Sequence, residues 1–402
     1  MKILFSNYAV PRLAENGGES RMLAIIKALA ETNDVTVYAT DPELPGARGA
    51  EVCAHLIGLG VRNVVSGHWN LGRLLAGSRF DLLYCEFWHV AELLVPPFRA
   101  ANPRSPVVVD SVDLHFVREE AGVKIGSCSP ERAADTRHRE LAIYREADLA
   151  VTVTREDDSI LHELLPGIRT VIVPIIVPLH GRRPAAREKI LSFIGNFNHP
   201  PNADGIAWFG REIWPAVKQS IPDAKLEIVG RDPPPVVKSL GETAGIHLLG
   251  WVPETAPCLD RAAISIAPLR FGGGMKVKVT EALAHGLPVV STSFGVQGFG
   301  GRSGEHYRVA DDPADFAQAV VDLLQNPTEA QAMGLRGQFL VERLCSPQAV
   351  DRVVTDIPSQ VTLKGETKAF GSRLRFQLGA LLELAGRRIS RQGRIWMRMK
   401  NP

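Results

Sequence analysis

A glycine-rich segment in the last third of the chain combines residue types that suit phosphate binding. Gly272, Gly273 and Gly274 leave backbone N–H groups unobstructed, and the stretch from Met275 to Ala284 has the composition of a helix that Gly286 ends. The first N–H groups of a helix lack partners, and the helix dipole places its positive end there. The segment therefore predicts an anion-binding loop at a helix N-terminus.

Three charged residues in this predicted helix narrow the kind of anion. Lys276 and Lys278 oppose the helix dipole, which costs about 0.3–1 kcal/mol each, and a bound anion would reverse that cost. Glu281, one turn further along, can accept hydrogen bonds from sugar hydroxyls. We therefore expect a nucleoside diphosphate with an attached sugar at this loop.

Short apolar runs alternate with helical stretches on both sides of a proline-rich segment. They occupy residues 2–5, 35–39, 81–84, 106–110, 148–154, 170–174, 189–194, 225–230, 246–249 and 262–267. Continuously apolar strands alternating with helices are typical of parallel sheets that are covered on both faces. The sequence predicts an α/β protein with two Rossmann-like domains, residues 1–177 and 189–357, separated by a linker at 178–188. Such domains bind ligands in the cleft between them.

The composition restricts the class of protein. A chain of 402 residues, 45% hydrophobic and 22% charged, is a globular protein too long for one core. The five cysteines are far apart and lack metal-ligand spacing, which favours a reducing compartment and disfavours a zinc site. The N-terminus lacks a signal-peptide pattern, and the longest apolar run, Val171 to Leu179, is too short to span a bilayer. We expect a cytoplasmic protein.

The C-terminal segment differs from both domains in charge. Residues 371–402 contain eight basic residues and one acidic residue, a local net charge of +7, whereas the whole chain has +2. Leucines recur at helical spacing there, so residues 358–402 are predicted to form a basic amphipathic tail that contacts an anionic membrane surface at the inner face. Packing of the tail on the body or on a partner subunit is the alternative. Nucleic acid is not expected as a partner, because the basic residues lack interleaved aromatic residues.

Five motifs, in this order and at this spacing, resemble a known family. They are Gly195-Asn-Phe-Asn-His-Pro-Pro-Asn202, Lys225-Leu-Glu-Ile-Val-Gly-Arg231, Leu248-Leu-Gly-Trp-Val252, Ala267-Pro-Leu-Arg270 and the segment from Gly272 to Thr292. Together with the two Rossmann-like units, they resemble the retaining glycosyltransferases of the GT-B fold in glycosyltransferase family four (group one). The resemblance covers residues 1–356.

The resemblance implies roles for individual residues in the second domain. The glutamate that opens Glu-Ala-Leu-Ala-x-Gly binds the ribose hydroxyls of the donor in such enzymes, which implies that role for Glu281. Trp251 and Val252 would receive the edge of the base. The loop from Gly272 to Met275, which includes Gly273 and Gly274, would hold the donor phosphates and sugar.

The sequence departs from the family pattern at two places. Many members carry a second glutamate eight positions before the first, where this chain has Gly273. Many also carry an arginine and a lysine after the first strand of the second domain, where this chain has Asn196, Asn198 and Pro201. Asn196 and Asn198 are candidates for donor contact, with a turn or helix-cap role as the alternative.

The missing cations lead to a hypothesis about the diphosphate. Breaking the anomeric bond develops negative charge on the diphosphate, which must be stabilised. The sequence lacks an Asp-x-Asp motif at a strand end, which would indicate a metal site. We therefore expect a metal-independent enzyme without a cofactor. We expect Lys276 and Lys278, with Arg270 or Arg231, to supply the positive charge.

In the first domain, a polar stretch follows the predicted strand that ends near residue 110. It places Asp113, His115 and Arg118 at the carboxyl end of that strand, the edge that faces the cleft. Similar enzymes often have a histidine near the donor sugar here, so His115 and Asp113 are the candidate catalytic residues. A structural role for His115 is the alternative.

A second glycine pair lies near the N-terminus. Gly17 and Gly18 resemble the first-domain loop that lets donor and acceptor approach the backbone, although a plain turn would also explain them. Arg21, at the start of the next predicted helix, could contact an acceptor phosphate.

These observations predict a hexosyl-type glycosyltransferase of cell-envelope polysaccharide synthesis. Its partners would be a nucleotide sugar and a glycan or lipid-linked acceptor, and retention follows from the resemblance. Two other functions stay open. One is a protein that binds nucleotide sugars or glycans without turnover, and the other is a sugar epimerase on the same fold. The residues leave the donor base, the donor sugar, the linkage, the acceptor and the oligomeric state undetermined.

Overall fold

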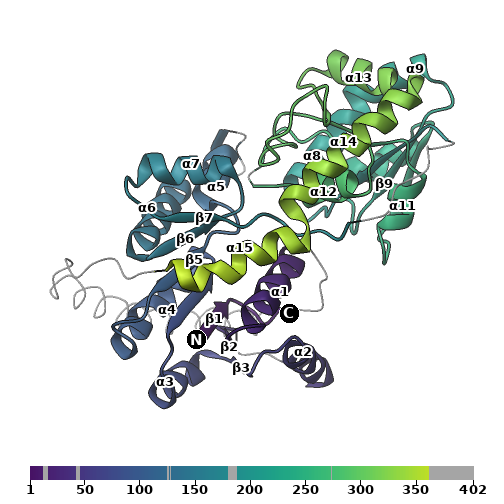
Figure 1. Cartoon of the computed structure of the whole chain (residues 1–402). Coiled ribbons are helices and arrows are strands. Elements are labelled where there is room, and N and C mark those ends of the chain that lie inside the picture. The colour runs from purple at the N-terminus through teal and green to yellow at the C-terminus, as the bar shows by residue number, and fades with distance from the viewer. Residues whose placement is uncertain are drawn as a thin grey trace, which may run out of the picture.

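The computed structural model describes residues 1–11, 17–41, 46–124, 126, 128–179, 188–272 and 274–361. Within these ranges the chain forms two α/β domains, each built on one parallel sheet (Figure 1). The predicted fold class of two Rossmann-like domains is confirmed. No helix in the described part of the chain is long and apolar enough to cross a membrane.

The sheet of the first domain has seven strands, all parallel, in the order β3-β2-β1-β4-β5-β6-β7. The strands are β1 (Lys2–Asn7), β2 (Asp34–Ala39), β3 (Asn63–Ser66), β4 (Leu82–Glu86), β5 (Val107–Asp110), β6 (Leu149–Thr152) and β7 (Thr170–Ile172). The order changes direction between β1 and β4. In doubly wound sheets, ligands bind at the carboxyl ends of the strands beside such a point.

Helices cover both faces of this sheet. They are α1 (Gly17–Ala30), α2 (Gly46–Gly58), α3 (His68–Gly77), α4 (Trp88–Ala101), α5 (His115–Lys124), α6 (Pro130–Glu146) and α7 (Arg155–Leu164). Alternate residues of β1 enter two separate cores: Ile3 and Phe5 pack with residues of α1 and α2, and Leu4 packs with residues of α4 and α6. The strand is apolar throughout because both of its faces are buried.

The second domain repeats the plan with six parallel strands in the order β10-β9-β8-β11-β12-β13. They are β8 (Ile190–Ile194), β9 (Lys225–Val229), β10 (Ile246–Gly250), β11 (Ile264–Ala267), β12 (Val289–Ser291) and β13 (Arg308–Val309). The order changes direction between β8 and β11. The glycine-rich segment directly follows β11, so it lies at the carboxyl edge beside this switch point.

The helical elements of the second domain include one departure from the predicted pattern. They are α8 (Pro200–Trp208), η1 (Phe209–Ile213), α9 (Trp214–Ser220), α10 (Pro235–Lys238), η2 (Ser239–Glu242), α11 (Ala256–Arg261), α12 (Val277–Ala284), α13 (Pro313–Gln325) and α14 (Pro327–Cys345). The sequence predicts one helix over residues 203–219, but a π-helical turn, η1, separates α8 from α9. Pro215 lies in the first turn of α9 and has no N–H, which breaks the regular hydrogen-bond ladder.

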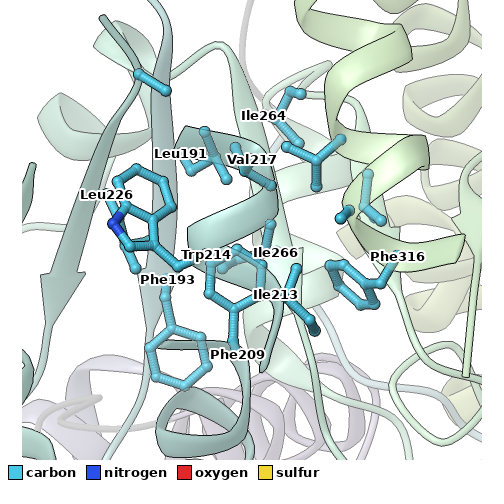
Figure 2. Close-up of a cluster of buried hydrophobic side chains, with 14 of the residues drawn as sticks. Leu191, Phe193, Phe209, Ile213, Trp214, Val217, Leu226, Ile264, Ile266 and Phe316 are labelled. Atoms are coloured by element: carbon cyan, nitrogen blue, oxygen red, sulfur yellow. The ribbon is translucent and has the colours of Figure 1, made fainter. Parts of the chain in front are cut away.

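Large side chains from η1 and the flanking helices fill the main core of this domain (Figure 2). The ring of Phe209 packs edge-on against Phe316 of α13 with centroids 5.7 Å apart, and Trp214 lies beside Phe209 at 6.4 Å. Trp214 also donates from Nε1 to the carbonyl of Ala244 at 3.2 Å, which satisfies its buried N–H. This core holds α8 and α9 against the sheet.

The last described helix, α15 (Pro347–Gln360), returns from the second domain to the first and lies along α1 (Figure 1). Ser346 caps its start by accepting from the N–H of Ala349, and Val350, Val354 and Ile357 are buried in the core of the first domain. Residues 347–357, which the sequence division counts with the second domain, therefore pack with the first. Most of the predicted linker and tail lies outside the described residues.

Candidate functional site

The carboxyl edges of the two sheets meet at the boundary between the domains. The N–H of Gly298 in the second domain donates to Glu156 of the first at 3.3 Å. A Cβ atom added to Gly298 would lie 2.5 Å from Thr154, and one added to Gly274 would lie 3.4 Å from Asp113. The glycine-rich segment of the second domain therefore faces the Asp113 loop of the first domain at close range.

The glycine-rich segment has the backbone that its sequence predicts. Gly272 and Gly274 have φ angles of 130° and 63°, which only glycine adopts readily, and Gly286 has a φ of 67° after α12. The helix begins at Val277, two residues later than the predicted start at Met275, and the side chain of the preceding residue, Lys276, makes no capping hydrogen bond. Met275 is buried, and Gly273 lies outside the described residues. The backbone donors at this helix start have no side-chain acceptor among the described residues.

Lys276 and Lys278 are partly buried beside this loop. Lys276 donates from Nζ to the carbonyl of Gly274, and Lys278 donates to the Asn202 side chain and lies 4.9 Å from the Phe193 ring centroid. Burial lowers the pKa of Lys276 to about 8, against the attraction of Asp157 and Asp113. Burial also lowers the pKa of Lys278 to about 7, helped by repulsion from Lys276. For both lysines burial outweighs the attraction of the nearby carboxylates, so an added negative charge would favour their charged forms.

Glu281 lies on the next turn of α12 and is half-buried. Burial raises its pKa to about 7, and Lys278 acts in the opposite direction. A carboxyl group near half-protonation at neutral pH can both donate and accept hydrogen bonds. The predicted sugar-binding glutamate therefore lies in the same site as the two lysines.

The other predicted cations of the second domain, Arg270 and Arg231, contact other side chains. Arg270 is held by Asp204, with Nε 2.8 Å from Oδ2, and its guanidinium lies 5.9 Å from the centre of the Trp208 ring. Arg231 lies 5.2 Å from the ring centre of Trp251, whose side chain is 60% exposed. Arg270 is therefore already neutralised, whereas Arg231 and Trp251 form an exposed flat surface.

The two asparagines that replace the family's cations form a turn. Asn196 Oδ1 accepts from the N–H of Asn198 at 3.0 Å, and the Asn196 carbonyl accepts from Asn202 Nδ2 at 2.7 Å. Both side chains are exposed after β8. The structure gives Asn196 the turn role that the sequence left open. Asn202, which the sequence analysis did not single out, links this turn to Lys278. Val252 is half-buried next to Trp251.

In the first domain, His115 makes hydrogen bonds with both ring nitrogens. Trp88 donates from Nε1 to His115 Nδ1 at 3.1 Å, and His115 Nε2 lies 3.2 Å from Asp113 Oδ1. Nδ1 can accept from an indole N–H only when it carries no proton, so the ring proton lies on Nε2 and is donated to Asp113. The indole therefore fixes the tautomer of the predicted catalytic histidine.

Asp113 is the anionic member of this group. Burial alone would raise its pKa, but hydrogen bonds from His115 and Arg118 hold the pKa of Asp113 below its ordinary value. The carboxylate is therefore charged at neutral pH, and it faces Gly274 across the domain boundary.

Glu140 positions this histidine, a role that the sequence analysis did not predict. Its buried carboxylate accepts from the N–H groups of His115 at 3.2 Å and Phe116 at 2.9 Å, and from the Tyr144 hydroxyl at 3.0 Å. It thus caps the start of α5 from the neighbouring helix α6. Burial raises the pKa of Glu140 to about 7 against these hydrogen bonds. No local pattern could have found this role, because the partners are 24 and 25 residues away.

Asp157 is a second residue that the sequence analysis missed. It is 5% exposed, its N–H donates to the capping Thr154 Oγ1 at 3.0 Å, and its Oδ2 has no hydrogen-bond partner among the described residues. Burial raises its pKa to about 6, while Lys276 acts in the opposite direction. Asp157 therefore brings a first-domain carboxyl group toward the lysine of the glycine-rich loop.

The predicted acceptor role of Arg21 is wrong, because the side chain is buried and fully engaged. Arg21 is 2% exposed and makes two hydrogen bonds to the Asp110 carboxylate, at 2.9 and 3.1 Å, and two to the Val173 carbonyl. It joins α1 to the ends of β5 and β7 as a structural ion pair. Gly17 and Gly18 are the first two residues of α1, while residues 12–16 lie outside the described ranges.

Glu86 and Tyr84 complete this buried network. Burial raises the pKa of Glu86 to about 8, and Asp110 adds repulsion that Arg21 partly offsets at 3.8 Å. Tyr84 donates from its hydroxyl to Asp110 at 2.7 Å. The described residues contain no group of three or more His, Cys, Asp or Glu side chains that could hold a metal ion.

Comparisons with known proteins agree with this fold. Residues 188–326 match the family described as glycosyl transferases group 1. A Klebsiella pneumoniae protein, described as an uncharacterized 44.6 kDa protein in the cps region, is 30% identical over 142 residues. The match covers 33% of this chain and 37% of the relative, so it spans little more than a third of that protein.

Two solved structures show how far the fold is shared. Sucrose-phosphate synthase from Thermosynechococcus elongatus has a TM-score of 0.67 and 16% identity, covering 89% of this chain and 98% of its own. HepE from Anabaena, in complex with UDP and glucose, has a TM-score of 0.66 and 14% identity, covering 89% and 99%. At these identities the likeness shows the fold alone.

Two facing parallel α/β domains with a glycine-rich loop in the second define the GT-B class of proteins. Within the second domain, residues 188–326 match the group 1 glycosyl transferase family. The family resemblance read from the sequence is confirmed.

We predict that Arg21→Ala lowers the free energy of unfolding by about 3–5 kcal/mol, because it leaves the buried Asp110 carboxylate without its cation. Arg62→Ala is the matched control. Its guanidinium is 73% exposed and pairs with Asp34, so its loss changes the free energy by at most about 1 kcal/mol. Urea unfolding followed by tryptophan fluorescence measures both. Equal stability of the two variants would contradict a structural role for Arg21.

Proposed function

We propose that this protein transfers a hexosyl group from a nucleoside-diphosphate sugar to a glycan or lipid-linked acceptor. The observation that carries the proposal is the pair Lys276 and Lys278, two partly buried ammonium groups beside an uncapped helix start and two left-handed glycines. A diphosphate would favour the charged forms of both lysines and would accept from the first N–H groups of α12. The group 1 family match of the same domain supports this ligand class.

The lysines would also stabilise the leaving group. Cleavage of the bond to the anomeric carbon transfers an electron pair to the phosphate oxygen, and the nucleoside diphosphate departs with added negative charge. Lys276 and Lys278 are already placed and partly desolvated, so their attraction for that charge is stronger than in water. We propose that protein cations and the start of α12 do this work without a metal ion.

The neighbouring residues suit the other parts of the donor. We propose that Glu281 binds the ribose hydroxyls, and that Trp251 with Val252 receives the base next to Arg231. Asp113, which is ionised and faces Gly274, would stabilise the positive charge that develops on the sugar ring. His115, held by Trp88 and Glu140, would orient Asp113. Retention at the anomeric carbon rests on the family resemblance.

We propose the pathway from the Klebsiella pneumoniae relative. That protein is described as lying in a cps region, and this supports a role in cell-envelope polysaccharide synthesis. The acceptor would then be a growing glycan or a lipid-linked saccharide.

A binding protein without turnover is the second candidate. It is favoured by Arg270, which is tied to Asp204, and by the asparagine turn in place of the family's cations. Incubation with UDP-glucose, UDP-galactose, UDP-N-acetylglucosamine or GDP-mannose, with and without disaccharide and lipid-linked acceptors, separates the functions. We expect nucleoside diphosphate release that depends on the acceptor. Binding without release would support the second candidate, and sugar conversion without acceptor would indicate an epimerase.

We predict that Lys276→Ala and Lys278→Ala each weaken UDP binding by more than tenfold, since a hydrogen bond to a charged group contributes about 1.5–3 kcal/mol. Isothermal titration calorimetry measures the affinity. Lys225→Ala is the control, because Lys225 begins β9 at the opposite edge of the sheet and pairs with Glu188 on the surface. UDP affinity that both site variants retain would exclude the lysines as phosphate ligands.

We predict that the UDP affinity measured by the same titration depends on pH. The pKa values of Lys276 and Lys278 are lowered to about 8 and about 7, so both charges are present at pH 6 and are lost as the pH rises above these values. UDP binding must then take up protons, and we expect the affinity to fall between pH 7 and 9.

We further propose that the basic tail, which lies outside the described residues, binds an anionic membrane surface. The full chain should then sediment with phosphatidylglycerol vesicles at low salt but not with phosphatidylcholine vesicles. A chain ending at residue 361 should stay in the supernatant. Equal sedimentation of both chains would remove the tail from this role.

A further inference from the structure

A group of aromatic rings lies at the switch point of the first sheet and is not used by the donor site. Tyr8 follows β1, Phe87 follows β4, and His89 is the second residue of α4. Because β1 and β4 are neighbours where the strand order reverses, these three side chains share the carboxyl edge at which open parallel sheets bind ligands.

The three rings connect to the donor site in one direction and to solvent in the other. His89 is central, with ring centroids 5.3 Å from Phe87, 5.8 Å from His115 and 6.5 Å from Tyr8. The side chain of His115 is 16% exposed, and Tyr8 is 47% exposed. Tyr8, His89 and Phe87 thus form an aromatic track, centred on His89, that leads outward from the proposed reaction centre.

The backbone holds this track in place. Phe87 has a φ of 67°, a left-handed conformation that is uncommon for a bulky residue and unfavourable for it. Trp88 lies buried between the track and the helices, edge-on to His89 at 5.7 Å. Residues kept in such conformations cluster at ligand sites, where the surrounding structure supports the strain.

The charges around the track indicate the ligand class. Burial lowers the pKa of His89 to about 4, so the ring is neutral at physiological pH. Arg139, which lies over the Trp88 ring, pairs with Glu92, and Arg21 pairs with Asp110. A phosphate would therefore find no uncommitted cation among these described residues. An aromatic face attracts partly positive C–H groups, and a sugar ring presents such groups on its flat side.

We propose that the aromatic track binds an uncharged pyranose of the acceptor glycan, one sugar beyond the residue that receives the transferred hexose. This rests on the proposed glycosyltransferase function and names its acceptor class as an oligosaccharide of at least two sugars. The acceptor hydroxyl would lie near His115, and the next ring would stack on His89 and Tyr8.

Saturation-transfer NMR on the full chain with saturating UDP tests the proposal. The probes are maltose, cellobiose and lactose, with methyl α-glucoside as the single-ring comparison. We expect saturation of C–H protons on one face of a disaccharide, and weaker binding of the methyl glucoside. Tyr8→Ala and His89→Ala should each raise the disaccharide Kd about 2- to 10-fold. Tyr8→Phe keeps the ring and should bind as the unaltered chain does.

Phe339→Ala is the control for loss of an exposed aromatic ring, because Phe339 is 64% exposed on α14 and outside the track. UDP affinity, measured on each variant, should stay unchanged. If no disaccharide receives saturation, or if both alanine variants bind as tightly as the Phe339 control, the track is not an acceptor site. If UDP itself does not bind the unaltered chain, the proposed function fails instead, so the two failures are distinguishable.

Discussion

The ion pair between Arg21 and Asp110 is the interaction on which the first domain depends. It joins α1 to the ends of β5 and β7 at the edge that carries the site. Asp110 is also the last residue of β5, and its carboxylate accepts from the N–H of Val112, which has a left-handed φ of 59°. The loop that leads to Asp113 and His115 is thus set by a buried charge that must stay paired.

The buried cations of the second domain differ from Arg21 in the direction in which their pKa values are shifted. Burial lowers the pKa of both Lys276 and Lys278, whereas the pKa of Arg21, which pairs with Asp110 inside the first domain, is raised. Ionisable groups with pKa values shifted by burial are typical of sites that bind a charged ligand. Asp113 and Asp157 of the first domain attract Lys276, so the electrostatics of the site depend on both domains being together.

Because the site needs both domains, the contacts that cross the domain boundary help to maintain it. Helix α15 leaves the second domain and adds Val350, Val354 and Ile357 to the core of the first. Glu156 accepts from the N–H of Gly298 on the other side of the site. The contact of α15 is extensive and apolar, whereas the contact between Gly298 and Glu156 is a single hydrogen bond. A relative motion of the domains that opens the site would therefore keep the α15 contact and break the hydrogen bond.

The sequence alone determined the two-domain plan, the glycine loop and the helix carrying Lys276, Lys278 and Glu281. Hydrophobic periodicity and the torsional freedom of glycine are properties of neighbouring residues, so a single chain reveals them. Only the tertiary structure decided that Arg21 is structural and that Glu140 holds His115. It also placed α15 on the first domain. These roles depend on partners distant in sequence, and the sheet order that unites them is not written in any local pattern.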